Sequence, residues 1–336
     1  MDRRRFTASL GGFAALHAVP ALAQDGRTDL RLAHNMPLTH HLHKGAETIA
    51  ANFNEASRKH RIVVYGAGQL FNEKALVQGV TTGAVDMSFT TSGFWSGTAS
   101  AISVSDYPLL FDSYAAARAG FEGEMGKAIA AQMERDNVRV LGWLAFGFND
   151  VLLNNQRPIR KVDDLKGLRM RTPNPLAAAV LKAAGAGPVV LSASEVYLAM
   201  QRGTIDGTLT GATAVVQRKF YEVAKYATVI PFGFSAQPVT INRKVWTRLA
   251  PDEQKALADA VTTASAQTAK AAEADAEAAI ATFAKHIQVD RFTPEDLAAF
   301  AKVARPAADE YLKQVAGPDG ARVLALAEAD VKKVRR

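Results

Sequence analysis

The segment Asp164–Leu176 constrains the fold most strongly, because it encodes a strand, a stop and a helix start in one short run. Apolar and basic residues alternate along Leu168–Arg171, which predicts a strand with one buried face. Pro173 ends that strand, and Asn174, followed by a proline, suits the cap of a helix that closes at Gly185. A strand that leads directly into a helix is the repeating unit of an α/β fold.

Arg171 lies at the carboxyl end of this predicted strand. Ligands of open α/β sheets gather at that end of the strands. A guanidinium group offers a planar fork of donors that matches a carboxylate. The alternative is a surface arginine paired with a nearby acid. We expect the ligand-binding role, because the rest of the chain supports it.

Strands and helices alternate through the first hundred residues, which predicts a parallel sheet. Strands are expected at Leu30–His34, Arg61–Tyr65 and Val85–Thr90, with a helix after each of the first two. The run Phe146–Asn154 is a predicted crossover strand toward a second lobe, and Pro251 to Ile287 predicts a helix of roughly 50 Å that lies across both lobes.

An internal echo supports two similarly built lobes. Gly83-Ala-Val-Asp-Met-Ser-Phe-Thr90 and Gly203-Thr-Ile-Asp-Gly-Thr-Leu-Thr210 share a pattern of glycine, aspartate and threonine. Each follows a predicted helix that its glycine closes, and each runs into a segment rich in small polar residues. Their carboxyl ends would face each other across a cleft.

Composition excludes several classes of function. A length of 336 residues suits two domains, and the absence of cysteine excludes disulfides, thiol catalysis and zinc–thiolate sites. The net charge of +7 is dispersed and lacks interleaved aromatics, so we expect no nucleic-acid partner. A basic bias favours an anionic small ligand.

The first 23 residues are expected to form an export signal rather than part of the fold. A basic start at Arg3–Arg5, an apolar run from Ala8 to Val19 and the small-x-small site Ala21-Leu-Ala23 fit a cleavable signal peptide. Adjacent arginines before Phe6 also resemble a twin-arginine signal, which leaves the export route open.

Enzymatic readings have weaker support. His40, His41 and His43 could bind zinc as part of a hydrolase, but histidines at a strand-to-helix loop are more often solvated or cap the helix that follows. No Gly-x-Ser-x-Gly sequence is present to serve as a hydrolase nucleophile. We therefore predict no catalytic residue, no cofactor and no metal.

From about Leu30 to the end, the sequence resembles the periplasmic solute-binding proteins of TRAP transporters, the dicarboxylate-receptor group. The segments that carry the resemblance are His43-Lys-Gly-Ala-Glu47, Gly68-Gln-Leu, Gly83-x-x-Asp86-Met, Pro158-Ile-Arg, Asp163–Arg171, Ser194-Glu-Val-Tyr197 and Phe220–Tyr226. The resemblance implies an exported periplasmic receptor that carries a small organic acid to membrane permease subunits, and that works as a monomer. The same scaffold can serve a sensor instead, and an exported scaffold protein without a ligand is a further alternative.

The resemblance implies an α/β, two-lobed periplasmic-binding-protein architecture with a hinge and a long helix spanning both lobes. We place lobe I at residues 24–147 plus 233–270, and lobe II at residues 148–232 plus 271–336. Arg171 matches the arginine that pairs with the ligand carboxylate in such proteins.

Three predicted pocket positions depart from the family pattern. Asn149 stands where a second arginine is common, Ala193 replaces an aromatic residue, and Thr208-Leu-Thr-Gly211 replaces Gln-Glu-Asn-Pro. These changes favour a monocarboxylate with an apolar or hydroxylated body.

The predicted ligand site combines an anchor, polar supports and walls. Trp143 and Phe148, like Phe146, are as readily core residues as walls, and Glu73 suits a first-turn helix acid as well as the cleft. The expected ligand-binding residues are Arg171, Asn149, Thr210, Thr91, Trp143, Phe148 and Glu73.

Overall fold

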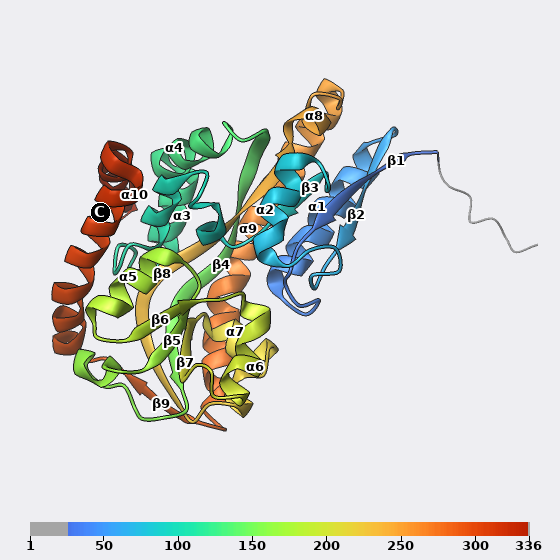
Figure 1. Ribbon diagram of the computed structural model, residues 1–336. Helices are drawn as coiled ribbons and strands as arrows, with labels where there is room; N and C mark the ends of the chain where they lie inside the picture. Colours follow the sequence, from blue (N-terminus) through green and yellow to red (C-terminus); the bar gives the residue numbers. More distant parts are fainter. Residues whose placement is uncertain (1–25, 335–336) are drawn as a thin grey trace, which may run out of the picture.

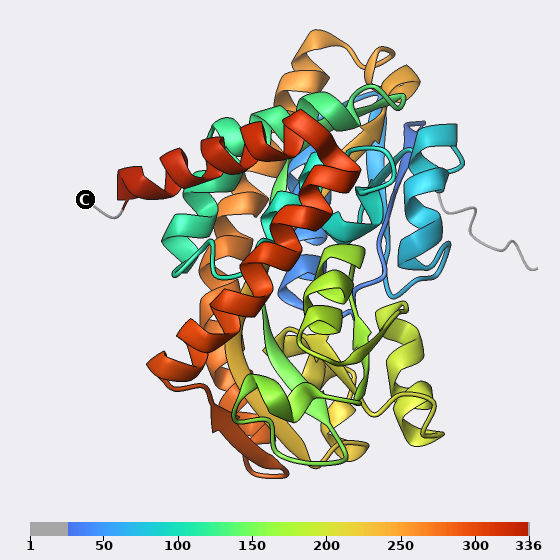
Figure 2. The same cartoon turned by 60° about the vertical axis from the view of Figure 1, so that its left-hand side comes forward.

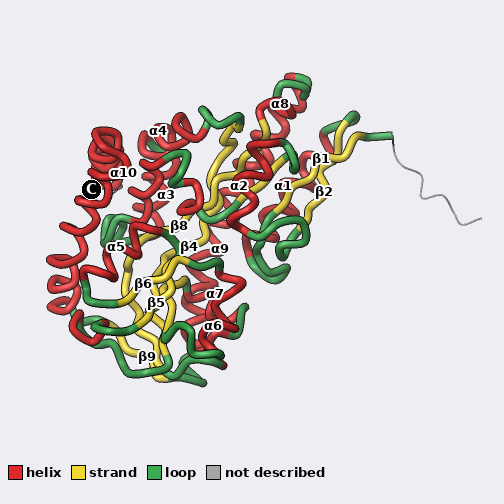
Figure 3. Tube along the Cα trace, in the orientation of Figure 1, coloured by secondary structure: helices red, strands yellow, loops and turns green. Residues whose placement is uncertain are grey.

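The computed structural model describes residues 26–334, so the predicted export signal lies outside the described residues. The described chain forms one mixed sheet covered by helices (Figures 1 and 3). Its nine strands are β1 (Thr28–Ala33), β2 (His60–Tyr65), β3 (Met87–Phe89), β4 (Val138–Asn154), β5 (Arg169–Thr172), β6 (Gly187–Val190), β7 (Gly207–Thr210), β8 (Tyr226–Asn242) and β9 (Gln288–Arg291).

Ten α-helices and five short 3₁₀ helices connect the strands in the described part of the chain. The α-helices are α1 (His41–Ala56), α2 (Glu73–Thr82), α3 (Tyr114–Glu122), α4 (Glu124–Met133), α5 (Pro175–Ala183), α6 (Val196–Gln201), α7 (Ala212–Gln217), α8 (Arg243–Trp246), α9 (Pro251–Phe283) and α10 (Pro294–Val334). The 3₁₀ helices are η1 (Ser92–Trp95), η2 (Ser100–Asp106), η3 (Val162–Leu165), η4 (Ala193–Glu195) and η5 (Phe220–Glu222).

The sheet is built from two matching blocks. Its strand order is β2-β1-β3-β8-β4-β7-β5-β6, with β9 paired to β8. The blocks β2-β1-β3 and β6-β5-β7 are each parallel, and the antiparallel pair β8–β4 joins them. We call β1–β3 with α1 and α2 the first half, and β5–β7 with α5, α6 and α7 the second half.

The strands β4 and β8 run through both halves. The sequence predicts two separate strands at Thr228–Pro231 and Pro238–Asn242, but the structure joins them in one strand of 17 residues. Pro231 is tolerated because it falls in an irregular stretch, between the β8 residues that pair with Asn149 and Val151. Three such register shifts interrupt the β4–β8 pairing and bend it.

Two long helices tie the halves together. The predicted long helix is confirmed as α9, whose 33 residues span roughly 50 Å and contact both α1 and α7. The helix α10 crosses another face of the molecule, over α3, α4 and α5 (Figure 2), and bends at Gly317, where the sequence predicts a helix end. The two-lobed α/β architecture with a shared long helix is therefore confirmed.

The internal echo corresponds to one structural device used twice. In the first half, Asp86 Oδ2 accepts hydrogen bonds from the backbone N (2.8 Å) and Nε (3.0 Å) of Arg31. In the second half, Asp206 Oδ2 accepts from the same two atoms of Arg169, at 2.8 and 3.1 Å. Each aspartate thus holds an arginine of the neighbouring parallel strand, in the middle of β1 and at the start of β5.

The glycines of the echo end their helices as predicted. Gly83 and Gly203 both have left-handed backbone angles, with φ of 84° and 67°. This conformation is accessible to glycine without steric cost and terminates a helix. At the start of α5, Asn174 Oδ1 accepts the Ala177 amide at 2.8 Å, which confirms the predicted cap.

The domain boundaries remain a prediction. The proposed boundary positions near residues 147 and 233 fall within β4 and β8, and the one near residue 270 falls within α9. Across residues 26–334, no helix has the length and apolar character needed to cross a membrane.

Candidate functional site

Arg171 is buried at the carboxyl end of β5, with only 2% of its surface exposed. Its Nε donates to Leu191 O (2.9 Å) and its Nη1 to Leu209 O (3.2 Å), which fixes the guanidinium plane. Burial lowers the pKa of Arg171 to about 10, so the group stays charged at neutral pH. The structure therefore holds a rigid positive charge inside the molecule.

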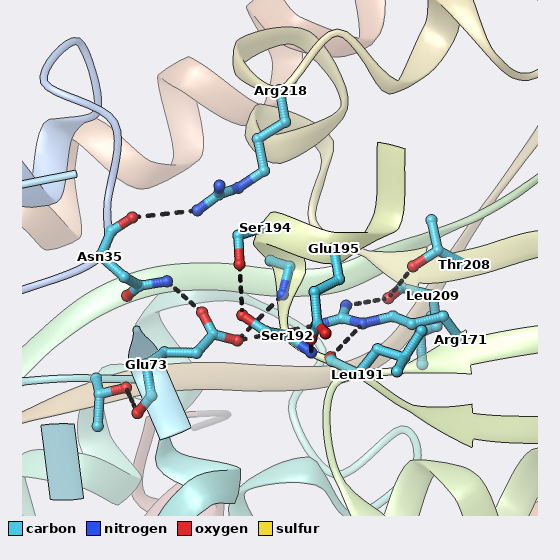
Figure 4. A network of polar contacts seen from close by, with 12 residues as sticks. Asn35, Glu73, Arg171, Leu191, Ser192, Ser194, Glu195, Thr208, Leu209 and Arg218 are labelled. Atoms are coloured by element: carbon cyan, nitrogen blue, oxygen red, sulfur yellow. Dashed lines mark hydrogen bonds and ion pairs between the residues drawn. The ribbon is translucent and has the colours of Figure 1, made fainter. Parts of the chain in front are cut away.

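Glu73 faces Arg171 from the first half (Figure 4). It is buried at the first position of α2, and its Oε1 lies 4.0 Å from Arg171 Nη2. Its carboxylate also accepts hydrogen bonds from Asn35 Nδ2 and from the Ala193 amide (3.3 Å). Glu73 thus connects the two halves through polar contacts with both.

Arg218 is a second cation at the same place. It follows α7, and its Nη2 donates to the Asn35 backbone oxygen at 3.3 Å (Figure 4). Burial lowers the pKa of Arg218, while nearby Glu73 opposes that shift. The sequence analysis did not select Arg218, because only the tertiary position of α7 brings it to the cleft.

These groups surround a cavity of about 30 Å³ between the halves. A volume of this size holds one or two water molecules, so a larger ligand requires the halves or their side chains to move apart. The cavity is lined by Met36, Pro37, His40, Glu73, Thr91, Phe146, Arg171, Pro173, Ala193, Thr210, Ala214, Gln217, Arg218 and Ser235.

The structure brings four of the predicted ligand-binding residues together. Arg171, Glu73, Thr91 and Thr210 all line this cavity. The side chain of Asn149 is not described, and only its backbone pairing with Gly233 is seen.

Trp143 and Phe148 lie elsewhere. Trp143 lines a separate cavity of about 410 Å³ among α3, α4 and α9 and packs against Phe121, with ring centroids 5.1 Å apart. Phe148 contacts Tyr114 and Phe234 edge-on, at 5.2 and 5.1 Å. The aromatic residue that lines the cavity between the halves is Phe146.

A bulge in β4 explains why Phe146, rather than the predicted Phe148, lines the cavity between the halves. Regular alternation places Phe146 and Phe148 on the same face. The pairing with β8 shifts between Ala145 and Gly147, so Phe146 is an extra residue and the following side chains change face. Gly147 accommodates the bulge with a φ of 122°.

The histidines that could have bound a metal have other partners. His40 caps α1 by accepting the Leu42 amide at Nδ1 (3.1 Å), which confirms the capping alternative. His41 contacts Asp275 and Ala145 O, each at 3.0 Å. Among residues 26–334, no group of three His, Cys, Asp or Glu side chains is arranged to hold a metal ion.

His43, the third histidine considered as a metal ligand, contacts the ring of His34. His34 Nδ1 accepts the Met36 amide (3.1 Å), so its proton resides on Nε2, which donates to His43 Nδ1 (3.0 Å). Burial, with a smaller contribution from nearby His43, lowers the pKa of His34 to about 3. The His34 ring is therefore neutral at neutral pH.

A charged, buried site between two matching α/β halves joined by crossing strands defines a two-lobed ligand-binding protein. The model of the bacterial extracellular solute-binding proteins, family 7, matches residues 32–314. The chain belongs to this family.

Named relatives have similar lengths. The chain is 28% identical over 318 residues, 94% of each chain, to the 2,3-diketo-L-gulonate-binding periplasmic protein YiaO of Escherichia coli K12. It is 29% identical, over 98% of its length and 99% of the relative, to the C4-dicarboxylate-binding periplasmic protein DctP of Rhodobacter capsulatus. A crystal structure of a TRAP periplasmic solute-binding protein from Ochrobactrum anthropi superimposes with a TM-score of 0.81 at 28% identity, covering 93% of this chain and 97% of that one.

Proposed function

We propose that this protein is the extracytoplasmic receptor of a TRAP transporter and binds a small organic acid in the cavity between its halves. The observation that carries the proposal is the buried, oriented guanidinium of Arg171, held by two backbone carbonyls and facing the cavity. Glu73 Oε1 lies 4.0 Å away, too far for a hydrogen bond, so the buried guanidinium keeps N–H donors for an anionic ligand. Family membership and the carboxylate ligands in the names of YiaO and DctP support this reading.

In the proposed mechanism, Arg171 pairs with the ligand carboxylate while Thr91 and Thr210 supply hydroxyl groups and Phe146 forms a wall. Thr91 follows β3 in the first half, whereas Thr210 ends β7 in the second. A ligand that contacts both halves stabilises the closed form, because its affinity for that form exceeds its affinity for the open one. No covalent bond changes, so no acid–base pair is required.

The proposed setting is the periplasm, with TRAP permease subunits as the membrane partner. The family and the periplasmic relatives support this location. Export would depend on residues 1–23, whose tandem arginines make the twin-arginine route a specific proposal.

Titration calorimetry of the mature protein against small mono- and dicarboxylates tests the proposal. Arg171→Ala should weaken binding of every carboxylate by at least about 100-fold, since truncating one member of a buried charge pair costs several kcal/mol. Circular dichroism should show a retained fold.

Arg169→Ala is the matched control. Arg169 lies two residues away on the same strand, but its side chain is half exposed and pairs with Asp206. This variant should bind as the wild type does. Undiminished carboxylate binding by Arg171→Ala would reject the assignment.

A further inference from the structure

The charges that line the cavity between the halves do not balance. Among its lining residues the charged ones are Arg171 and Arg218 from the second half and Glu73 from the first. His40 also lines the cavity, but burial holds its pKa well below the ordinary value, so it is neutral. Two cations and one anion give these lining residues a formal charge of +1; the carboxylate of Glu195, which also acts on Arg171, is solvent-exposed and outside the lining.

The two arginines retain hydrogen-bonding capacity. Each guanidinium has five N–H donors. Arg171 uses two of them on backbone carbonyls, and within the described chain Arg218 donates only to the Asn35 oxygen. Both face the same carboxylate, Glu73, whose Oε1 is 4.0 Å from Arg171 and therefore beyond hydrogen-bond distance.

Neutral polar groups at the cavity also lack partners. Ser235 is only 2% exposed, and its Oγ has no hydrogen-bond partner among the described residues. Gln217 Oε1 is likewise buried and unpaired there. Both residues line the cavity. Buried polar atoms are costly when unpaired, so these atoms are available to hydrogen-bond with hydroxyl groups of a ligand.

We propose that Arg218 and Glu73 set the charge of the accepted ligand, so that the site selects hydroxylated monocarboxylates over dicarboxylates. This inference rests on the proposed function and refines it. Arg171 binds the single carboxylate, and Arg218 balances Glu73. Glu73, Ser235 and Gln217 bind ligand hydroxyls.

The charge count gives the physical reason. One carboxylate neutralises a site of charge +1. A dicarboxylate brings a second negative charge into a small desolvated space that already holds the Glu73 carboxylate, and like charges brought together there are unfavourable. The named relatives include both ligand types, a hydroxylated keto acid for YiaO and C4-dicarboxylates for DctP, so family membership alone leaves the selection open.

Calorimetry with four probes of equal chain length separates charge from hydroxylation. Butyrate and erythronate are monocarboxylates without and with hydroxyl groups, and succinate and tartrate are the corresponding dicarboxylates. The wild type should bind erythronate at least about tenfold more tightly than either succinate or butyrate. One unfavourable charge, for succinate, or a few missing hydrogen bonds, for butyrate, are enough to produce this affinity ratio.

Charge variants should then shift the preference toward dicarboxylates. Glu73→Gln raises the site to +2, so the ratio of tartrate to erythronate affinity should increase by at least about tenfold. Adding Arg218→Gln to Glu73→Gln returns the charge to +1 and should restore the wild-type ratio. Thermal melting of each variant verifies that it folds.

The outcomes separate this inference from the proposed function. If the wild type binds carboxylates and loses them on Arg171→Ala, while the tartrate-to-erythronate ratio stays the same in Glu73→Gln, the selectivity inference is overturned and the receptor function stands. If the wild type binds none of a wider panel of organic acids, both fail.

Discussion

The two halves of this protein share a scaffold but differ at one decisive position. In each, an aspartate fixes an arginine of a neighbouring parallel strand, as Asp86 does for Arg31 and Asp206 for Arg169. Two residues further along β5 lies Arg171; the register places Ala33 at the corresponding position of β1. The shared residues maintain the strands, and the differing residue carries the ligand chemistry.

The contrast also explains how the cavity acquires opposite charges on its two sides. The second half supplies both arginines, whereas the first half supplies the Glu73 carboxylate and the amide of Asn35. Closure therefore brings complementary charges together, although they do not cancel fully. A symmetric pair of halves with an arginine at each position would repel on closing.

The aspartates provide the strongest test of the shared scaffold. Asp206→Ala and Asp86→Ala should each lower the free energy of unfolding by about 2 to 3 kcal/mol, because each removes charge-assisted hydrogen bonds and leaves a backbone N–H unpaired. In the second half, Arg169 Nη2 donates one more hydrogen bond to Asp206 Oδ1 (2.6 Å). This bond should add little to the free energy of unfolding, since Arg169 is half exposed. Urea denaturation measures both values.

The pH dependence supplies a check on the Asp206 result. Hydrogen bonding to Arg169 lowers the pKa of Asp206 below its usual value. The stability that Asp206 contributes is therefore present at neutral pH and is lost as the pH falls through its folded-state pKa.

If only one of the two variants, Asp86→Ala or Asp206→Ala, lowered the free energy of unfolding, the echo would not be a common structural device.

At the position of His34 the first half has a titratable side chain and the second half does not. His34 follows β1 and corresponds to Thr172 of β5. Its folded pKa of about 3 lies below the ordinary 6.5, so the unfolded chain binds a proton that the folded chain does not, and stability falls as the pH drops below 6.5. His34→Thr should reduce the loss of unfolding free energy between pH 7 and pH 5 by about 2 kcal/mol.

Chemical denaturation of wild type and His34→Thr at the two pH values measures this difference. Thr172→Ser serves as a control on the matching strand and should leave the pH dependence unchanged. Equal losses in wild type and His34→Thr would assign the acid sensitivity to other groups.

The paired glycines should give the smallest effect. Gly83→Ala and Gly203→Ala each force a side chain into a left-handed conformation, which costs about 1 kcal/mol. A Cβ at Gly203 meets no atom within 4 Å, and one at Gly83 meets Asn242 at an ordinary 3.5 Å. The two variants should therefore lower the melting temperature by similar amounts. A markedly larger drop for one variant would show that the two glycines do not play the same part in ending their helices.

Local signals made much of the fold predictable. The cap at Asn174, the glycine ends at Gly83 and Gly203, and the strand position of Arg171 depend on residues close in sequence. The uninterrupted run of helix formers from Pro251 predicted the long helix α9, although the helix ends at Phe283 rather than at the predicted Ile287.

The parts that could not be predicted depend on distant packing. Arg218 reaches the cleft because α7 packs against α9 and places its end near Asn35. The exchange of Phe148 for Phe146 depends on a bulge that only the pairing with β8 defines. Alternation along a sequence cannot reveal where a ladder gains a residue.

The bulged pair β4–β8 also determines how such a molecule can open. Both strands continue from one half to the other. The two halves can therefore separate by bending of this two-stranded ribbon while its hydrogen bonds stay intact. Among the described residues, the polar contacts that such a motion would break include Asn35 with Arg218, His40 with Thr213 and Glu73 with the Ala193 amide. A ligand that contacts both halves would then favour the bent, closed form of the ribbon.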